Sequence, residues 1–118
     1  MTYINGGHVP PLLVNSQGLK ETLLPTGSAV GAYLDAKHSI RETTIQPGDI
    51  LFAYTDGLTD ASNLAGEDFH EEELLPLLTG TGDARTLLAN VQRRLADFTD
   101  CSACLDDVTL LAVKRLQK

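Results

Sequence analysis

The clearest alternation of apolar side chains lies in the middle of the chain. Ile50, Phe52 and Tyr54 alternate with Leu, Ala and Thr, and successive residues of a strand point to opposite faces of a sheet. Because both sets are largely apolar, the pattern predicts a strand that is covered on both sides. Asp56 continues the face of Tyr54, where a carboxylate is costly unless it is paired or binds a metal. Gly57 follows and permits a turn.

A second apolar strand is expected at residues 108–113, directly after two acids. Alternation places Asp106 on one face of this strand and Asp107 on the other. If the two strands are neighbours, one of these carboxylates faces the same side as Asp56. Carboxylates without a nearby His or thiolate suit a hard cation such as Mg²⁺ or Mn²⁺. The alternative is that these acids cap turns and face water.

Further strands are predicted in the first half of the chain. Residues 2–5 and 11–15 favour a hairpin across the turn at residues 6–8, and residues 19–24 favour a third short strand. Residues 37–45 alternate in part. The chain therefore predicts an α+β fold with about five antiparallel strands and two helices on one face.

The two helices are expected between the central and the final strand. Asp68 and Glu71 form a capping-box pattern for a helix that ends near Leu78, with Pro76 weakening its last turn. Asp83 is the expected cap of the second helix. One apolar stripe at helical spacing follows, which favours core packing over a partner groove; it consists of Leu87, Leu88, Val91, Leu95 and Phe98.

Composition favours one acidic domain. The chain has 118 residues, 42% of them hydrophobic, and a formal net charge of −7, which suits a single core and disfavours nucleic acid and anionic membranes as partners. No apolar run reaches a membrane span and no signal peptide is visible, so we expect a cytoplasmic location. Cys101 and Cys104 follow a helix rather than a strand and have no second pair, so free thiols are favoured over a redox or zinc site.

Four short motifs occur in order along the chain. They are residues 5–13 (NGGHVPPLL), 47–52 (PGDILF), 54–61 (YTDGLTDA) and 106–111 (DDVTLL). Together they resemble the motifs of the bacterial SpoIIE-type phosphatases, which are PPM (PP2C-like) metal-dependent serine/threonine phosphatases. The resemblance covers residues 2–115, nearly the whole chain.

The resemblance implies a site for two divalent cations, Mn²⁺ or Mg²⁺. By position in the motifs, Asp56 and Asp106 resemble metal ligands and Gly57 permits the turn. Asp107 would orient the ligands without binding the metal itself. The resemblance implies that water held between two such cations would attack the phosphorus without a covalent enzyme intermediate. His8 occupies a place near the family's catalytic cleft and is a weak catalytic candidate; the alternative is a turn histidine bonded to backbone.

The resemblance also implies a substrate and a partial domain. The substrate would be a phosphoserine or phosphothreonine of a regulatory protein, such as an anti-sigma-factor antagonist. The family domain, an α-β-β-α sandwich, is roughly twice this length, and its first half carries acidic metal motifs that are absent here. We therefore expect residues 1–118 to be a single partial domain, the C-terminal portion of the phosphatase domain, and inactive alone.

A half sandwich leaves one sheet face uncovered, and Ile50, Phe52 and Tyr54 are expected there. Burying such a face favours a homodimer. Two other classes of function stay open: a non-catalytic interaction module that keeps the phosphatase fold, and an unrelated small acidic α+β protein with chance motif matches.

Overall fold

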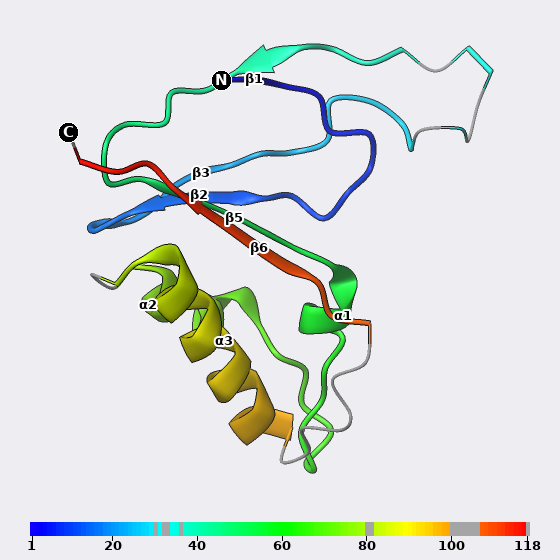
Figure 1. The fold of residues 1–118 in the computed structure, drawn as a ribbon. Helices are drawn as coiled ribbons and strands as arrows, with labels where there is room; N and C mark the ends of the chain where they lie inside the picture. The colour runs from blue at the N-terminus through cyan, green and yellow to red at the C-terminus, as the bar shows by residue number, and fades with distance from the viewer. Residues whose placement is uncertain (30, 32–33, 36, 80–81, 100–106, 118) are drawn as a thin grey trace.

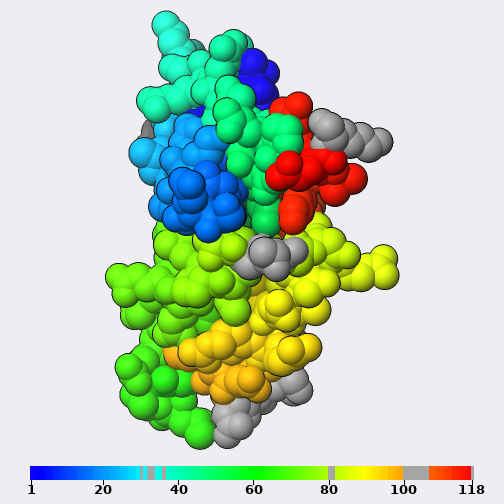
Figure 2. All heavy atoms as spheres, turned by 90° about the vertical axis from the view of Figure 1, so that its left-hand side faces the viewer, coloured from blue at the N-terminus to red at the C-terminus, as the bar shows by residue number. Residues whose placement is uncertain are grey.

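The computed structural model describes residues 1–29, 31, 34–35, 37–79, 82–99 and 107–117. In chain order its elements are β1 (Thr2–Tyr3), β2 (Leu12–Asn15), β3 (Gly18–Thr22), β4 (Arg41–Glu42), β5 (Ile50–Tyr54), α1 (Asp56–Thr59), α2 (Glu71–Leu78), α3 (Ala84–Thr99) and β6 (Leu110–Lys114). Helices α2 and α3 lie against one side of the sheet, and β1 and β4 lie on the opposite side (Figure 1). A view from the side shows the helical layer below the strands (Figure 2).

The main sheet is antiparallel and has the order β3-β2-β5-β6. The α+β class and the two helices on one face are confirmed, but among the described residues this sheet holds four strands rather than about five. The segment expected at residues 37–45 contributes only β4, which pairs with β1 in a separate two-stranded ribbon.

The expected hairpin between residues 2–5 and 11–15 is wrong, because β1 pairs with β4 and β2 pairs with β3 and β5. The side chain of Asn5 explains the difference. Its Oδ1 accepts hydrogen bonds from the amides of Gly7 and His8, and its Nδ2 donates to the carbonyls of His8 and Leu23. These bonds fix the turn to the segment after β3, so β1 leaves the sheet instead of folding back along β2.

The core lies between the sheet and the helices. Alternation holds along β5, but Ile50, Phe52 and Tyr54 are buried against the helical layer, so the expectation that this face is uncovered is wrong. The helices supply the opposing apolar side chains of this core, namely Leu74, Leu78, Leu87, Val91 and Leu95. The apolar stripe of α3 is therefore core, as its spacing predicts.

The other face of the sheet is only partly covered. Leu51 pairs with Leu13 on one side and with Val113 on the other, so these three side chains share a face. Leu13 is buried, but on the edge strand β6 Leu111 is 54% exposed and Val113 is 47% exposed. The uncovered apolar surface thus belongs to the edge strand rather than to the centre of the sheet.

Helix α3 begins with a side-chain cap, whereas helix α2 begins without one. Asp83 accepts a hydrogen bond from the Thr86 amide at 2.8 Å and caps α3, as predicted. The capping box expected before α2 is wrong, because Asp68 instead accepts from the Ser62 hydroxyl and the cap residue His70 makes no side-chain capping bond. In the described part of the chain, no helix is long and apolar enough to cross a membrane.

Candidate functional site

The end of β5 and the start of β6 meet at one edge of the molecule. Tyr54 pairs with Leu110, and the amide of Thr55 donates to the carbonyl of Thr109 at 3.1 Å. Asp56 follows immediately in one segment and Asp107 lies just before the other. The structure therefore brings together the two motifs that sequence analysis placed side by side.

Gly57 lies in close contact with the opposing segment. A Cβ atom at this position would lie 2.5 Å from the carbonyl oxygen of Asp107 and 3.1 Å from its carbonyl carbon. Real side chains do not approach backbone so closely, so only glycine fits without a shift of the chain. Gly57 is not among the residues with positive φ, and close approach rather than the expected turn is the reason for a glycine here.

Asp56 does not continue the core-facing side of β5, as the alternation implied. The strand ends at Tyr54 and Asp56 is the first residue of α1, so the change to helical backbone turns its side chain away from the core. Asp56 is exposed, and its carboxylate forms no hydrogen bond or ion pair with the described residues. The carboxylate oxygens are free to accept an external ligand.

Asp107 is also exposed and adopts a left-handed backbone conformation with φ of 63°. Asp106, the other expected ligand, lies outside the described residues, as do Cys101 and Cys104. Within the described ranges no group of three or more His, Cys, Asp or Glu side chains is placed to hold a metal ion. The donors at this edge are oxygen atoms, which hard divalent cations prefer, and they fit one part of a coordination sphere.

His8 lies in the turn held by Asn5. Its ring is exposed, and Nδ1 lies 2.6 Å from the carbonyl oxygen of Val9. The ring also lines a hollow of about 250 Å³ beside Leu23 and Leu51. No hydrogen bond or ion pair among the described residues joins His8 to Asp56, which favours the turn histidine over the catalytic candidate.

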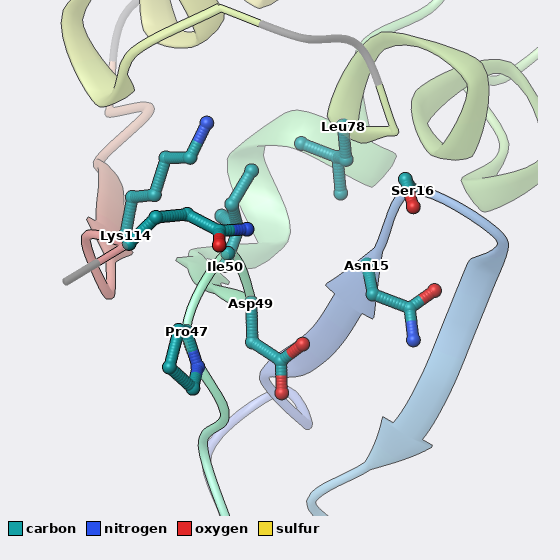
Figure 3. Close-up of a pocket in the computed structure, with 9 residues that line it drawn as sticks. Asn15, Ser16, Pro47, Asp49, Ile50, Leu78 and Lys114 are labelled. Carbon is teal, nitrogen blue, oxygen red and sulfur yellow. The ribbon is translucent and has the colours of Figure 1, made fainter.

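A separate hollow of about 230 Å³ lies at the beginning of β5, whereas Asp56 follows its end. Its lining is drawn in Figure 3 and consists of Asn15, Ser16, Pro47, Gly48, Asp49, Ile50, Leu78, Lys114 and Gln117. The Lys114 ammonium donates to the carbonyl of Gly82, and the Asp49 carboxylate is paired with Lys20. Both charged groups here therefore have structural partners, and the paired strand ends carry the candidate chemistry.

Sequence analysis missed the role of Thr55. Its hydroxyl donates to the carbonyl of Asp107 at 3.3 Å and accepts from the amide of Thr109 at 3.0 Å. The available signal was a hydroxyl residue directly before the Asp-Gly pair, at the point where a strand gives way to a turn.

Comparison with known proteins identifies relatives of this chain. The family model described as Stage II sporulation protein E (SpoIIE) matches residues 1–116. Protein IcfG of Synechocystis sp. (strain ATCC 27184 / PCC 6803 / Kazusa) is 39% identical over 116 residues, which are 98% of this chain and 18% of that protein. The chain thus spans less than a fifth of this curated relative.

Two of the similar solved structures cover most of this chain. The structure of the RsbU and RsbW domains of Rv1364c from Mycobacterium tuberculosis has a TM-score of 0.70 and 30% identity, covering 98% of this chain and 32% of that one. The SiaA-PP2C domain of Pseudomonas aeruginosa has a TM-score of 0.72 and 18% identity, covering 89% of this chain and 42% of that one, and supports the fold alone. From the family match over residues 1–116, this chain belongs to the SpoIIE family, and it shares the fold of the SiaA-PP2C domain.

Proposed function

We propose that this chain is part of a metal-dependent protein serine/threonine phosphatase domain. The observation that carries the proposal is the junction of the two strand ends, where Gly57 lies against Asp107 and the carboxylate of Asp56 is exposed and unpaired among the described residues. An exposed, unpaired carboxylate beside a second acidic segment is accessible to a divalent cation, which prefers oxygen ligands.

In this proposal Asp56 and Asp106 are ligands of Mn²⁺ or Mg²⁺. Gly57 lets the two acidic segments approach, and Asp107 supports them through its backbone, which accepts the Thr55 hydroxyl. A bound cation supplies a water of lowered pKa and neutralises charge on the phosphoryl group. The chain's own contribution is to hold carboxylates at one exposed edge of a rigid sheet.

The proposed substrate is a phosphoserine or phosphothreonine in a regulatory protein such as an anti-sigma-factor antagonist. Support comes from the family and from a solved relative that carries RsbU and RsbW domains. The exposed position of the strand junction suits a phosphorylated side chain presented by another protein.

Residues 1–118 are proposed to be one partial domain with negligible activity alone. Two carboxylates leave most coordination positions of two cations to water, and the chain covers 32% and 42% of the two solved relatives. The remaining ligands would come from residues outside this chain.

The deciding experiment compares Asp56→Asn with Asp60→Asn in the full-length protein. Both acids are exposed and lie in the same helical turn, so the pair is matched in charge and location. We expect Asp56→Asn to lower Mn²⁺-dependent hydrolysis of a phosphoserine peptide by more than the roughly 10- to 100-fold loss that residues supporting metal ligands cause. Asp60→Asn should retain activity.

Equal activity of Asp56→Asn and the unaltered protein would overturn the proposal. Full-length protein that binds a phosphoprotein but never hydrolyses it, with or without Mn²⁺, would instead support the non-catalytic interaction module.

A further inference from the structure

Thr55 contacts the opposing segment through both its backbone and its side chain. Its amide donates to the Thr109 carbonyl at 3.1 Å, its hydroxyl accepts from the Thr109 amide at 3.0 Å, and the same hydroxyl donates to the Asp107 carbonyl at 3.3 Å. One residue thus makes all three hydrogen bonds to a segment more than fifty positions away.

The hydroxyl takes the place of a backbone carbonyl. In an antiparallel hydrogen-bonded pair each residue donates its amide to the carbonyl of the other, so the Thr109 amide would ordinarily bond to the Thr55 carbonyl. That carbonyl instead accepts from the Leu58 amide at 3.0 Å, because Thr55 is the cap residue of α1. The Thr55 side chain therefore completes the strand pair after the helix has taken the backbone acceptor.

The Asp107 carbonyl is constrained twice. It accepts the Thr55 hydroxyl, and it is the atom that lies 2.5 Å from where a Gly57 Cβ would be. Thr55 and Gly57 flank Asp56 in the sequence, so both neighbours of the candidate ligand contact one backbone atom of the opposing acidic segment.

We propose that Thr55 is a positioning residue that holds Asp56 at a fixed distance from the segment of Asp107 and thereby sets the affinity of the site for Mn²⁺. This inference rests on the proposed function of Asp56 as a metal ligand. A residue without a hydroxyl would leave the Thr109 amide without its partner, and the two acidic segments would be free to separate while β5 and β6 stay paired up to Tyr54 and Leu110.

Three variants test the role of the hydroxyl in the full-length protein. Thr55→Val removes the hydroxyl and keeps the β-branched shape, whereas Thr55→Ser keeps the hydroxyl and removes the methyl group. Thr109→Val is the matched control, because it removes a hydroxyl for which the described residues provide no hydrogen bond and keeps the backbone groups that Thr55 contacts. Thr55→Ala replaces Thr55→Val if the latter does not fold.

The first measurement is amide hydrogen exchange of Thr109 without metal. Loss of one hydrogen bond should speed this exchange roughly ten-fold in Thr55→Val, with no such change in Thr55→Ser or Thr109→Val. Unchanged protection of the Thr109 amide in Thr55→Val would overturn the inference.

The second measurement is the dissociation constant for Mn²⁺, obtained by calorimetric titration. Thr55→Val should weaken binding roughly ten-fold, and the Mn²⁺ concentration for half-maximal activity should rise while kcat at saturating Mn²⁺ changes little. Unchanged Mn²⁺ affinity in Thr55→Val, in a protein whose affinity falls on Asp56→Asn, would overturn the role of Thr55 alone. Unchanged affinity on Asp56→Asn would overturn the proposed function as well.

Discussion

The ammonium of Lys20 lies 2.6 Å from the carboxylate of Asp49, whose side chain is 5% exposed. The same carboxylate accepts the Gln46 amide at 2.8 Å and anchors the turn that leads into β5. Burial raises the pKa of Asp49, but the bonds from Lys20 and Gln46 and the charges of Lys20 and Arg115 outweigh it, so the pKa lies below its ordinary value.

This pair predicts a pH-dependent stability. Because the pKa of Asp49 is lower in the folded state, its contribution is present above the unfolded pKa of about 4 and is lost as the pH falls through the folded value. At pH 7 Asp49→Asn should lower the free energy of unfolding by about 1–3 kcal/mol. Urea unfolding of both proteins between pH 7 and pH 2 checks this: the difference should shrink at the acid end, and a constant difference would contradict the assignment.

Gly57→Ala should destabilise the junction of β5 and β6. The added methyl would lie 2.5 Å from the Asp107 carbonyl oxygen, and overpacking of this kind costs about 1–3 kcal/mol. Gly82→Ala is the control, because the atoms nearest its methyl would belong to the Thr86 side chain, at 3.1 Å, rather than to backbone. Thermal unfolding should show the larger loss for Gly57→Ala; equal losses would refute the close approach.

Alanine substitutions on the two faces of the sheet test which face the helices cover. Phe52 is fully buried against the helices, so Phe52→Ala should cost about 3–5 kcal/mol. Leu111 is 54% exposed on the opposite face, so Leu111→Ala should lower the free energy of unfolding by about 1 kcal/mol or less. Urea denaturation distinguishes the two, and the reverse order would mean that the helices cover the other face.

Self-association remains a prediction, now through a different face. The surface of Leu111 and Val113 on edge strand β6 replaces the one expected from sequence. Because these side chains are half exposed, burying each in both copies contributes about half of the roughly 1.5–3 kcal/mol for full burial. We expect a homodimer at micromolar concentration that Val113→Lys abolishes without loss of helicity. Sedimentation equilibrium checks this, and a strictly monomeric, folded chain would exclude it.

Metal binding by the isolated chain should be weak but specific. Calorimetric titration with Mn²⁺ should give heats that Asp56→Asn and Asp106→Asn each remove, because carboxylate oxygens are the expected donors. Titration of Asp60→Asn should match the unaltered chain. Heats that are unaffected by either ligand substitution would leave the two acids without a metal role.

Local patterns in the sequence were enough to predict several parts of this fold. Alternation along β5 identified its residues, the spacing of Leu87, Val91 and Leu95 identified a core helix, and Asp83 was recognised as its cap. The acidic motifs were expected to meet, and the pairing of Tyr54 with Leu110 brings their segments together.

The failures involve contacts that local patterns do not contain. The pairing of β1 depends on Asn5 bonding to Leu23, a contact between distant residues. The direction of Asp56 depends on Thr55 ending the strand and capping a helix, which breaks the period of two. Which face of β5 meets the helices depends on packing, since both faces are apolar in sequence.

The pairing of Tyr54 with Leu110 also has a kinetic consequence, because helices α1, α2 and α3 lie in the sequence between them. Closing so long a loop costs entropy before the contact is rewarded, and such pairings tend to slow folding. Pairing of the two acidic segments is therefore expected to be slow compared with formation of the local turns and helices. In a nascent or partly unfolded chain these carboxylates lie apart, so the proposed cation site would form only together with the native topology.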